Sequence, residues 1–281
     1  VQHGNSRFDK KVKGEKVKVI SSVATEKKYI GCIKRFYDWC KANDVPLVRI
    51  NSEIVELFLK SKIDHCVQKT TDGYRQSLSL VFDIEVNYIV SKKDSLLVPR
   101  AYRASHIHSL LASATQKLSL SIRLSASAGL RAVELDTIAR ESEVFEDNRA
   151  WGTERFEGME AGKKYVVIGK GGLKRSVYVT DDLATELESC RLPNPIRKTQ
   201  RQIHYIKRYS ILGGHSFSQQ FSRLSIATFG WSTGAHGLRH HYAQTRIIAL
   251  QKLGYVWVDA LEIVSREMGH FSTTNTLTYM R

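Results

Sequence analysis

Apolar residues recur at helical spacing through the first ninety or so positions of the chain. Over residues 25–42, apolar side chains return every three or four positions with Lys and Arg between them, as in an amphipathic helix. Residues 44–46 break that helix, and Asn51 or Ser52 is a suitable N-cap for a second one. A third helical region is expected from about 64 to 89, interrupted near Asp72-Gly73. This pattern predicts a small, all-helical domain.

The rest of the chain mixes two periodicities. Residues 105–113 and 118–128 have helical spacing, and we expect residues 133–139 to continue as a helix. Residues 163–168 and 174–180 are rich in β-branched and aromatic side chains, with a glycine-rich turn between them, which predicts a β-hairpin. From Asp181 onward the pattern is again helical. The fold class expected is mainly α, with a small β-sheet or hairpin in the second domain.

Polar and charged stretches suggest where the domains meet. Residues 1–22 are lysine-rich and predict a flexible basic arm, either a solvated tail or a segment that neutralises DNA phosphates. Residues 23–92 form the predicted helical domain, residues 93–102 a linker, and residues 103–281 the second domain.

Charge narrows the class of partner. The chain has 43 Lys and Arg against 28 Asp and Glu, a net charge of +15, which favours a polyanion such as DNA. No apolar run is long enough to span a bilayer, and because the basic N-terminal residues lack an apolar h-region, we do not expect them to be a secretory signal. The four cysteines are scattered and include no Cys-x-x-Cys pair, which is typical of a protein in a reducing compartment. We therefore expect a cytoplasmic, nucleoid-associated protein with double-stranded DNA as its partner.

Several cationic and nucleophilic side chains suit metal-free attack on a phosphodiester. Such a reaction needs a nucleophile, cations on the non-bridging oxygens, and a proton donor for the leaving oxygen. Arg131 and Arg239 could clamp one phosphate from two segments, because guanidinium matches phosphate geometry. Tyr279 is the candidate nucleophile, although a free phenol has a pKa near ~10.

Three further residues complete this candidate site. His236 lies three positions before Arg239, on the same face of a predicted helix, and could share a proton with the nucleophile. His270 offers another donor. Lys170 stands at the tip of the predicted hairpin, where it could reach the leaving oxygen as general acid.

The order and spacing of these residues resemble those of the tyrosine recombinases, the family of lambda-integrase-type and Xer-like enzymes. The similar segments are Gly-Leu-Arg-x-x-Glu at 129–134, the Gly-Lys-Gly turn at 169–171, His-x-Leu-Arg-His at 236–240, and Met-Gly-His followed nine residues later by Tyr279. The resemblance covers the whole second domain. More loosely, the helical first domain resembles the family's core-binding, SAM-like domain.

This resemblance implies a specific activity. Two domains would clamp DNA in a C shape, and Tyr279 would cleave it through a 3′-phosphotyrosine intermediate without metal, ATP or any other cofactor. Family members exchange strands through a Holliday junction as tetramers on two sites, so a homo-tetramer or hetero-tetramer is expected. A DNA-bending or directionality factor is a further partner that the family uses. Such integrases serve DNA integration and recombination, often on mobile genetic elements.

Simpler interpretations compete at several positions. His236 and His240 have helical metal-ligand spacing, but no Glu follows the first as in HExxH, so we expect no metal and take His240 as a supporting residue. Glu134 could merely pair with Arg131; in the family an acidic residue there holds the arginine. The turn at Lys170 lacks the spacing of a nucleotide-binding loop. Residues of the second domain with donors suited to DNA are Arg201, Gln220, Arg223, Lys174 and Arg175.

Two other functions remain open on the same fold. A type IB topoisomerase-like relaxase would use the same chemistry without site specificity. A DNA-binding accessory protein would keep the fold and lose the reaction, although Arg131, Lys170, Arg239 and Tyr279 are all present.

Overall fold

A computed structural model describes residue 20 and residues 22–200 and 203–281. The chain divides into two compact units, Val1–Leu97 and Val98–Arg281, each of which is described by itself. The predicted basic arm at 1–22, except Ile20 and Ser22, and the candidate DNA contact Arg201 lie outside the described residues. Among the helices described, none is both long and apolar enough to cross a membrane.

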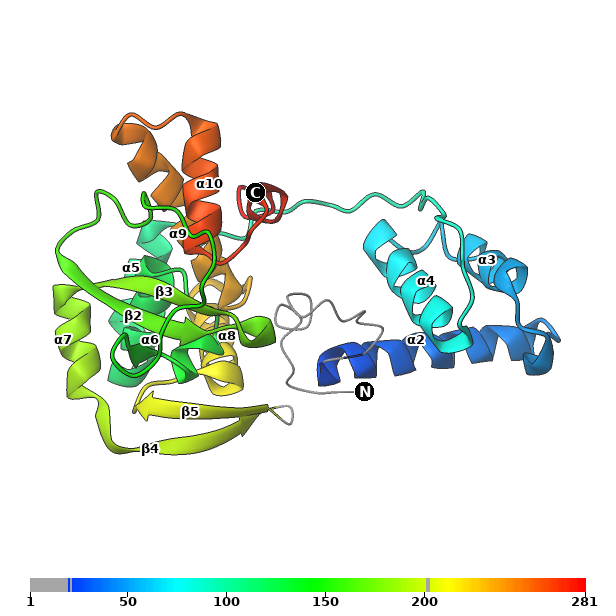
Figure 1. The fold of residues 1–281 in the computed structure, drawn as a ribbon, viewed down its shortest axis with the longest axis horizontal. Helices are drawn as coiled ribbons and strands as arrows, with labels where there is room; N and C mark the ends of the chain where they lie inside the picture. Colours follow the sequence, from blue (N-terminus) through cyan, green and yellow to red (C-terminus); the bar gives the residue numbers. More distant parts are fainter. Residues whose placement is uncertain (1–19, 21, 201–202) are drawn as a thin grey trace. The chain divides into compact units, whose positions relative to one another are not determined.

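The unit Val1–Leu97 is built from helices, as the apolar spacing predicts. Its helices are α2 (Val23–Ala42), the short 3₁₀ helix η1 (Leu47–Arg49), α3 (Ser52–Lys60) and α4 (Gln68–Phe82) (Figure 1). Asn51 is the N-cap of α3, and its side chain accepts a hydrogen bond from the Ile54 amide at 3.0 Å. The rings of Phe36, Phe58 and Tyr74 meet edge to face in the core.

The third helical region was expected to be longer and broken. Instead α4 runs without interruption through Asp72-Gly73 and ends at Asp83, which has a left-handed conformation with φ of 50°. That conformation turns the chain out of the helix, so residues 84–89 are not helical. At Gly73, inside the helix, a Cβ would lie 2.5 Å from Nζ of Lys28 on α2, so the glycine leaves room for that lysine side chain.

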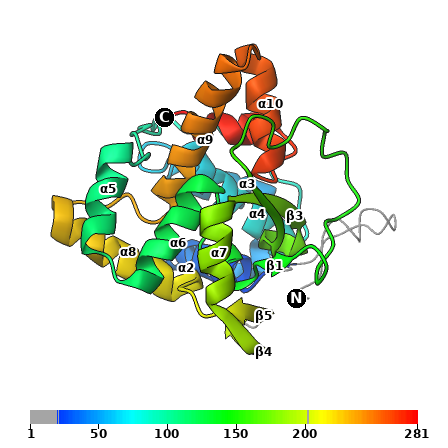
Figure 2. The ribbon, with the colours of Figure 1, turned by 90° about the vertical axis from the view of Figure 1, so that its left-hand side faces the viewer.

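A three-stranded antiparallel sheet lies within the unit Val98–Arg281. Its order is β1 (Ala139–Arg140), β2 (Gly162–Ile168) and β3 (Lys174–Thr180), and β2 and β3 form the predicted hairpin. The helices α5 (Ala104–Ser113), α6 (Gln116–Ser127) and α7 (Asp181–Ser189) lie together in this unit (Figure 2). Their apolar faces share one core with the sheet, which includes Leu110, Leu124, Val167, Val177 and Leu187.

The expected helix over residues 133–139 is wrong. Only Glu134–Asp136 form a 3₁₀ turn, η2, and Ala139-Arg140 then pair with β2 as strand β1. The Glu134 carboxylate accepts a hydrogen bond from the Arg131 amide at 2.8 Å, and Thr137 Oγ1 exchanges hydrogen bonds with the Ile168 backbone. These side-chain contacts turn the chain toward the sheet before a helix can extend.

A second hairpin appears where helix was expected after Asp181. Strands β4 (Arg191–Gln200) and β5 (Ile203–Tyr209) pair antiparallel as a separate two-stranded sheet below the main one in Figure 1. Pro193 and Pro195 disfavour helix there, since proline removes a backbone donor. Lys198 ties the hairpin to η2 by donating to both carboxylate oxygens of Asp136, at 2.7 and 2.8 Å.

The C-terminal part is helical, as predicted. It comprises α8 (Gly214–Phe229), α9 (His236–Lys252), α10 (Trp257–Glu267) and α11 (Thr273–Leu277). A second core joins α9, α10 and the end of the chain through residues such as Ala243, Leu250, Val264 and Met268. Tyr279 belongs to this core, so the folding of α9 and α10 directly positions the candidate nucleophile.

Candidate active site

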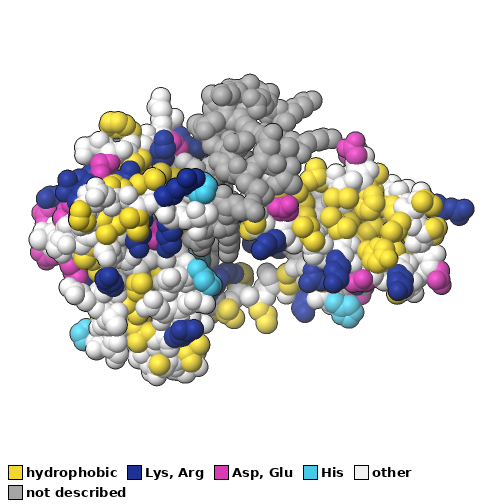
Figure 3. Space-filling model, turned by 90° about the horizontal axis from the view of Figure 1, so that it is seen from below, with side chains coloured by type: hydrophobic (Ala, Val, Ile, Leu, Met, Phe, Trp, Pro, Cys, Tyr) yellow, Lys and Arg dark blue, Asp and Glu magenta, His cyan; other side chains and the backbone are white. Residues whose placement is uncertain are grey.

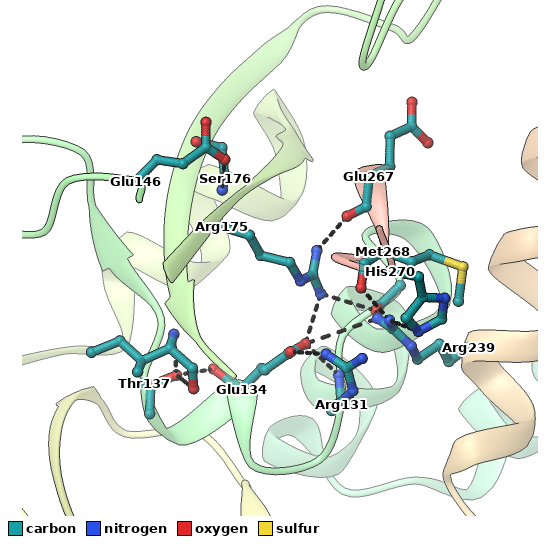
Figure 4. Close-up of polar contacts among 12 residues, drawn as sticks. Arg131, Glu134, Thr137, Glu146, Arg175, Ser176, Arg239, Glu267, Met268 and His270 are labelled. Carbon is teal, nitrogen blue, oxygen red and sulfur yellow. Dashed lines mark hydrogen bonds and ion pairs between the residues drawn. The ribbon is translucent and has the colours of Figure 1, made fainter. Parts of the chain in front are cut away.

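Three arginine side chains surround the carboxylate of Glu134 (Figure 4). Arg131 Nη1 donates to Oε1 at 2.6 Å, and Arg175 Nη2 donates to Oε2 at 2.6 Å. The Arg239 guanidinium lies 4.0 Å from Oε2. Glu134 and Arg239 are both 0% exposed and Arg175 is 1% exposed, whereas Arg131 is partly open to solvent. One buried carboxylate therefore orients three cations.

The charges around Glu134 decide its ionisation. Burial opposes the charged form, but Arg175, Arg131 and Arg239 outweigh it and hold the pKa of Glu134 well below its ordinary value. Burial, with the charges of Arg131 and Arg175, lowers the pKa of Arg239 to about 9, so this guanidinium is still a cation at neutral pH.

Backbone carbonyls fix the arginines further. Arg175 and Arg239 both donate to the carbonyl of Gly129, Arg175 also to that of Glu267 at 2.7 Å, and Arg239 to that of Met268. Gly129 has φ of +59°, and a Cβ there would lie 2.5 Å from the Tyr242 ring. The glycine before Leu130 and Arg131 is thus required by both conformation and space.

A chain of hydrogen bonds connects Arg239 to α11. Arg239 Nη2 lies 3.2 Å from His270 Nε2, and His270 Nδ1 lies 3.0 Å from Thr276 Oγ1. Since a guanidinium can only donate, Nε2 accepts and the imidazole proton is assigned to Nδ1. Burial and the charges of Arg239 and Arg131 hold the pKa of His270 far below its ordinary range, consistent with a neutral ring.

Tyr279 lies among three histidine rings and Arg239. Its ring centroid is 4.6 Å from that of His240, 5.2 Å from that of His270 and 5.3 Å from that of His236. The Arg239 guanidinium carbon is 5.7 Å from the same centroid. The tyrosine is 7% exposed, and Gln244 Nε2 donates to its carbonyl at 2.9 Å. The end of the chain is thus held against α9.

The histidines on α9 are neutral at physiological pH. Desolvation and the charge of Arg239 lower the pKa of His236 to about 4, although its side chain is still accessible to solvent. Burial and the charges of Arg100 and Arg281 lower the pKa of His240 to about 4. Within the described part of the chain, Nδ1 of the buried His240 has no hydrogen-bond partner. A neutral His236 beside Tyr279 can accept a proton.

Lys170 is set apart from this cluster. It lies in the exposed turn η3 (Lys170–Gly172), and no described residue forms a hydrogen bond or ion pair with its ammonium group. Its neighbour Gly169, however, packs on the cluster: a Cβ there would lie 2.7 Å from Glu134 Oε1 and 3.5 Å from Arg131 Nη1. The structure thus brings together Arg131, His236, Arg239, His270 and Tyr279, and places the backbone beside Lys170 against them.

Solved structures with a similar fold include a lambda integrase and the XerH site-specific recombinase. A lambda integrase tetramer bound to a Holliday junction is 19% identical, with 98% of this chain and 75% of that chain covered and a TM-score of 0.60. XerH bound to palindromic difH substrate in a post-cleavage complex is 17% identical, with 89% and 73% covered and a TM-score of 0.56. This chain has the tyrosine recombinase fold. No protein-family model and no curated protein sequence matches the chain.

Within this recombinase fold, one expected DNA contact is wrong. Arg175 is buried, and its guanidinium binds Glu134, Gly129 and Glu267, so it supports the arginine cluster and does not face DNA. Lys174 and Arg223 are exposed, and Gln220 is half-buried three positions before Arg223 on α8. On the face of this unit seen in Figure 3, Lys and Arg side chains are scattered among other residues.

The alternation of residues along β3 is a sequence signal for the buried position of Arg175. Arg175, Val177 and Val179 alternate along β3, so they share one face of the strand, and the two valines mark that face as buried. Thr276 and Gln244 were also missed, since neither lies in a recognisable motif. Among the described residues, no group of three or more His, Cys, Asp or Glu could hold a metal ion.

Proposed function

We propose that this chain is a site-specific DNA recombinase, an integrase-type strand transferase that cleaves and rejoins DNA through a 3′-phosphotyrosine. The observation that carries the proposal is the position of Tyr279, whose ring lies against Arg239, His236 and His270 beside the arginines held by Glu134. The recombinase fold supports it.

The proposed cleavage step gives separate roles to Tyr279, His236, Lys170 and the two phosphate-binding arginines. The Tyr279 oxygen bonds to the scissile phosphorus as the bond from phosphorus to the 5′ oxygen breaks. His236, being neutral, accepts the phenolic proton. Arg131 and Arg239 stabilise the charge on the non-bridging oxygens. Lys170 gives a proton to the departing 5′ oxygen. Rejoining reverses these transfers, so no ATP is consumed, and none of the proposed steps uses a metal ion.

Substrate and assembly follow from the same proposal. Double-stranded DNA would be held by both units, with Lys174, Gln220 and Arg223 among the contacts and the helical unit as a core-binding domain. The neighbour solved as a tetramer on a Holliday junction supports a homo-tetramer or hetero-tetramer acting on two sites. The net charge of +15 suits such a partner.

Covalent trapping tests the proposal. A duplex recovered from a random pool by selection with the full chain would carry a nick near the scissile phosphate, so that cleavage releases a short strand and traps the intermediate. We expect a denaturation-resistant protein–DNA adduct that Tyr279→Phe abolishes. Tyr178→Phe is the matched control, because this half-buried tyrosine stacks on Phe156, away from the cluster.

Other results of the trapping experiment would favour a different nucleophile or a different function. An adduct that persists in Tyr279→Phe would place the nucleophile at another tyrosine. Tight binding without any adduct would contradict the reaction and favour a DNA-binding accessory protein. Relaxation of supercoiled plasmids without recombination of a two-site plasmid would favour a topoisomerase-like relaxase.

A further inference from the structure

A long loop joins β1 to β2 and contacts both β3 and the end of α10, two elements next to the candidate site. It covers residues 141–161. On one side it binds β3: Glu146 Oε1 accepts a hydrogen bond from the Ser176 amide at 2.5 Å (Figure 4). On the other side it reaches the end of α10, where the Phe156 amide donates to Glu267 Oε1 at 2.8 Å. The loop is therefore built into the fold on both sides.

Asp147 forms hydrogen bonds with the backbone of Lys174, which directly follows the turn that contains Lys170. Its amide donates to the Lys174 carbonyl at 3.0 Å, and its Oδ2 accepts from the Lys174 amide at 3.1 Å. Lys174 is the first residue of β3 and pairs with Ile168, the last residue of β2. The turn between them is closed by a hydrogen bond from the Gly169 amide to the Leu173 carbonyl at 2.7 Å. Asp147 therefore holds the base of this turn from outside the hairpin.

The same aspartate is tied to the segment that carries His270. Trp151 Nε1 donates to the Asp147 carbonyl at 2.7 Å, and the Trp151 ring lies 4.9 Å from that of Phe271, the residue after His270. Leu173 also packs close to Gly269, where a Cβ would lie 2.9 Å from it. Asp147 is thus connected directly to Lys174, at the end of the Lys170 turn, and through Trp151 to Phe271, the residue after His270.

We propose that Asp147 is a positioning residue for Lys170. It fixes the turn η3 relative to Gly269 and His270, so that the Lys170 ammonium reaches the 5′ oxygen as the phosphorus–oxygen bond breaks. This inference rests on the proposed function. Asp147 touches neither DNA nor the reacting atoms, and its effect on the rate passes through the proton that Lys170 donates. A small displacement of a catalytic group is enough to cost orders of magnitude in rate.

A sulfur-substituted DNA separates proton donation from every other contribution. In the selected duplex the scissile 5′ oxygen is replaced by sulfur, which leaves as a thiolate and needs no proton. Lys170→Ala is expected to slow adduct formation about 10²- to 10⁴-fold on ordinary DNA and to recover on the sulfur substrate. Asp147→Ala should slow it about 10- to 100-fold and recover likewise. Asp147→Asn, which keeps an acceptor oxygen, should retain the wild-type rate.

Controls address folding. Glu141→Ala removes an exposed carboxylate from the same loop and should leave both rates unchanged. Trp151→Phe removes the donor to the Asp147 carbonyl but keeps an aromatic ring at this position, and provides a milder variant with the same expected pattern. Without any DNA, hydrogen exchange at the Lys174 amide should accelerate in Asp147→Ala, while exchange at the Val177 amide in the middle of β3 stays slow.

The outcomes are distinguishable. If Lys170→Ala recovers on sulfur and Asp147→Ala does not, Asp147 supports the fold only and the inference is overturned. An unchanged rate on ordinary DNA in Asp147→Ala also overturns it. If Lys170→Ala fails to recover, Lys170 is not the acid and the inference falls with that role. Absence of an adduct from the wild-type chain on both substrates overturns the proposed function itself.

Discussion

Glu134 and Lys170 belong to neighbouring parts of one candidate site and differ in almost every physical respect. The Glu134 carboxylate is fully buried and binds Arg131 and Arg175, with Arg239 4.0 Å away. Lys170 is exposed, and no described residue pairs with its ammonium group. The two regions touch through Gly169. The part that would grip the phosphate is therefore inseparable from the folded core, whereas the part that would donate a proton can be changed without disturbing the core.

The largest effect on stability is expected from Glu134→Gln. Loss of the carboxylate charge leaves the buried Arg175 and Arg239 without their counter-ion, and breaking a buried ion pair on one side costs roughly 3–5 kcal/mol. Urea unfolding followed by tryptophan fluorescence measures this. Glu186→Gln, which removes a partly exposed partner of Arg123, should cost about 0–1 kcal/mol. Equal losses in the two variants would contradict the special position of Glu134.

The second-largest effect on stability is expected at Gly169, where the Lys170 turn contacts Glu134. Gly169→Ala places a Cβ 2.7 Å from Glu134 Oε1, and because that carboxylate is held by arginines it cannot move away freely. Such overpacking costs about 1–3 kcal/mol. At Gly171 a Cβ meets nothing, so Gly171→Ala carries only the strain of its φ of +76°, roughly 1–2 kcal/mol. Thermal unfolding of both variants should rank Gly169→Ala as the less stable, and the opposite order would mean that the carboxylate can adjust.

These differences separate the features that local sequence pattern can indicate from those that it cannot. We could propose Arg131, Arg239, His270 and Tyr279 as site residues because each belongs to a short motif. Such motifs, and their order along the chain, can be recognised without knowing the fold. The hairpin around Lys170 was also predictable, since β-branched residues flank a glycine-rich turn. The sequence pattern was sufficient to predict elements, such as this hairpin, whose structure depends mainly on residues close together in the chain.

Interactions between distant segments were not predictable in the same way. Arg175 was expected to contact DNA, whereas its pairing opposite Val167 and its hydrogen bond to Glu134, 41 positions earlier in the chain, place it in the core. The strands β4 and β5 were read as helix, although their prolines argued against it. Asp147 lies in a loop without any motif, and its contact with Lys174 spans 27 positions of chain.

At acidic pH, protonation of the buried His240 should moderately lower the free energy of unfolding. The pKa of His240 is about 4 in the folded chain and near ~6.5 when unfolded, so the unfolded chain takes up the proton first. Its contribution is fully present above about pH 6.5 and is lost as pH falls toward 4, at up to about 1.4 kcal/mol per pH unit. His240→Asn should flatten the decline in stability between pH 6.5 and 5. The exposed His215→Asn is the control, and an unchanged slope in His240→Asn would contradict the assignment.

The smallest effect on stability is expected at Lys170 itself, together with a large effect on activity. Because its side chain is exposed and has no partner among the described residues, Lys170→Ala should change the free energy of unfolding by no more than about 0.5 kcal/mol. On ordinary DNA the same variant loses the general acid, worth about 10²- to 10⁴-fold in rate. Denaturant unfolding and single-turnover adduct formation, measured on one preparation, compare the two effects directly. A Lys170→Ala variant that is destabilised as much as Gly169→Ala would show that the turn is part of the core after all, and the contrast between the two regions would be lost.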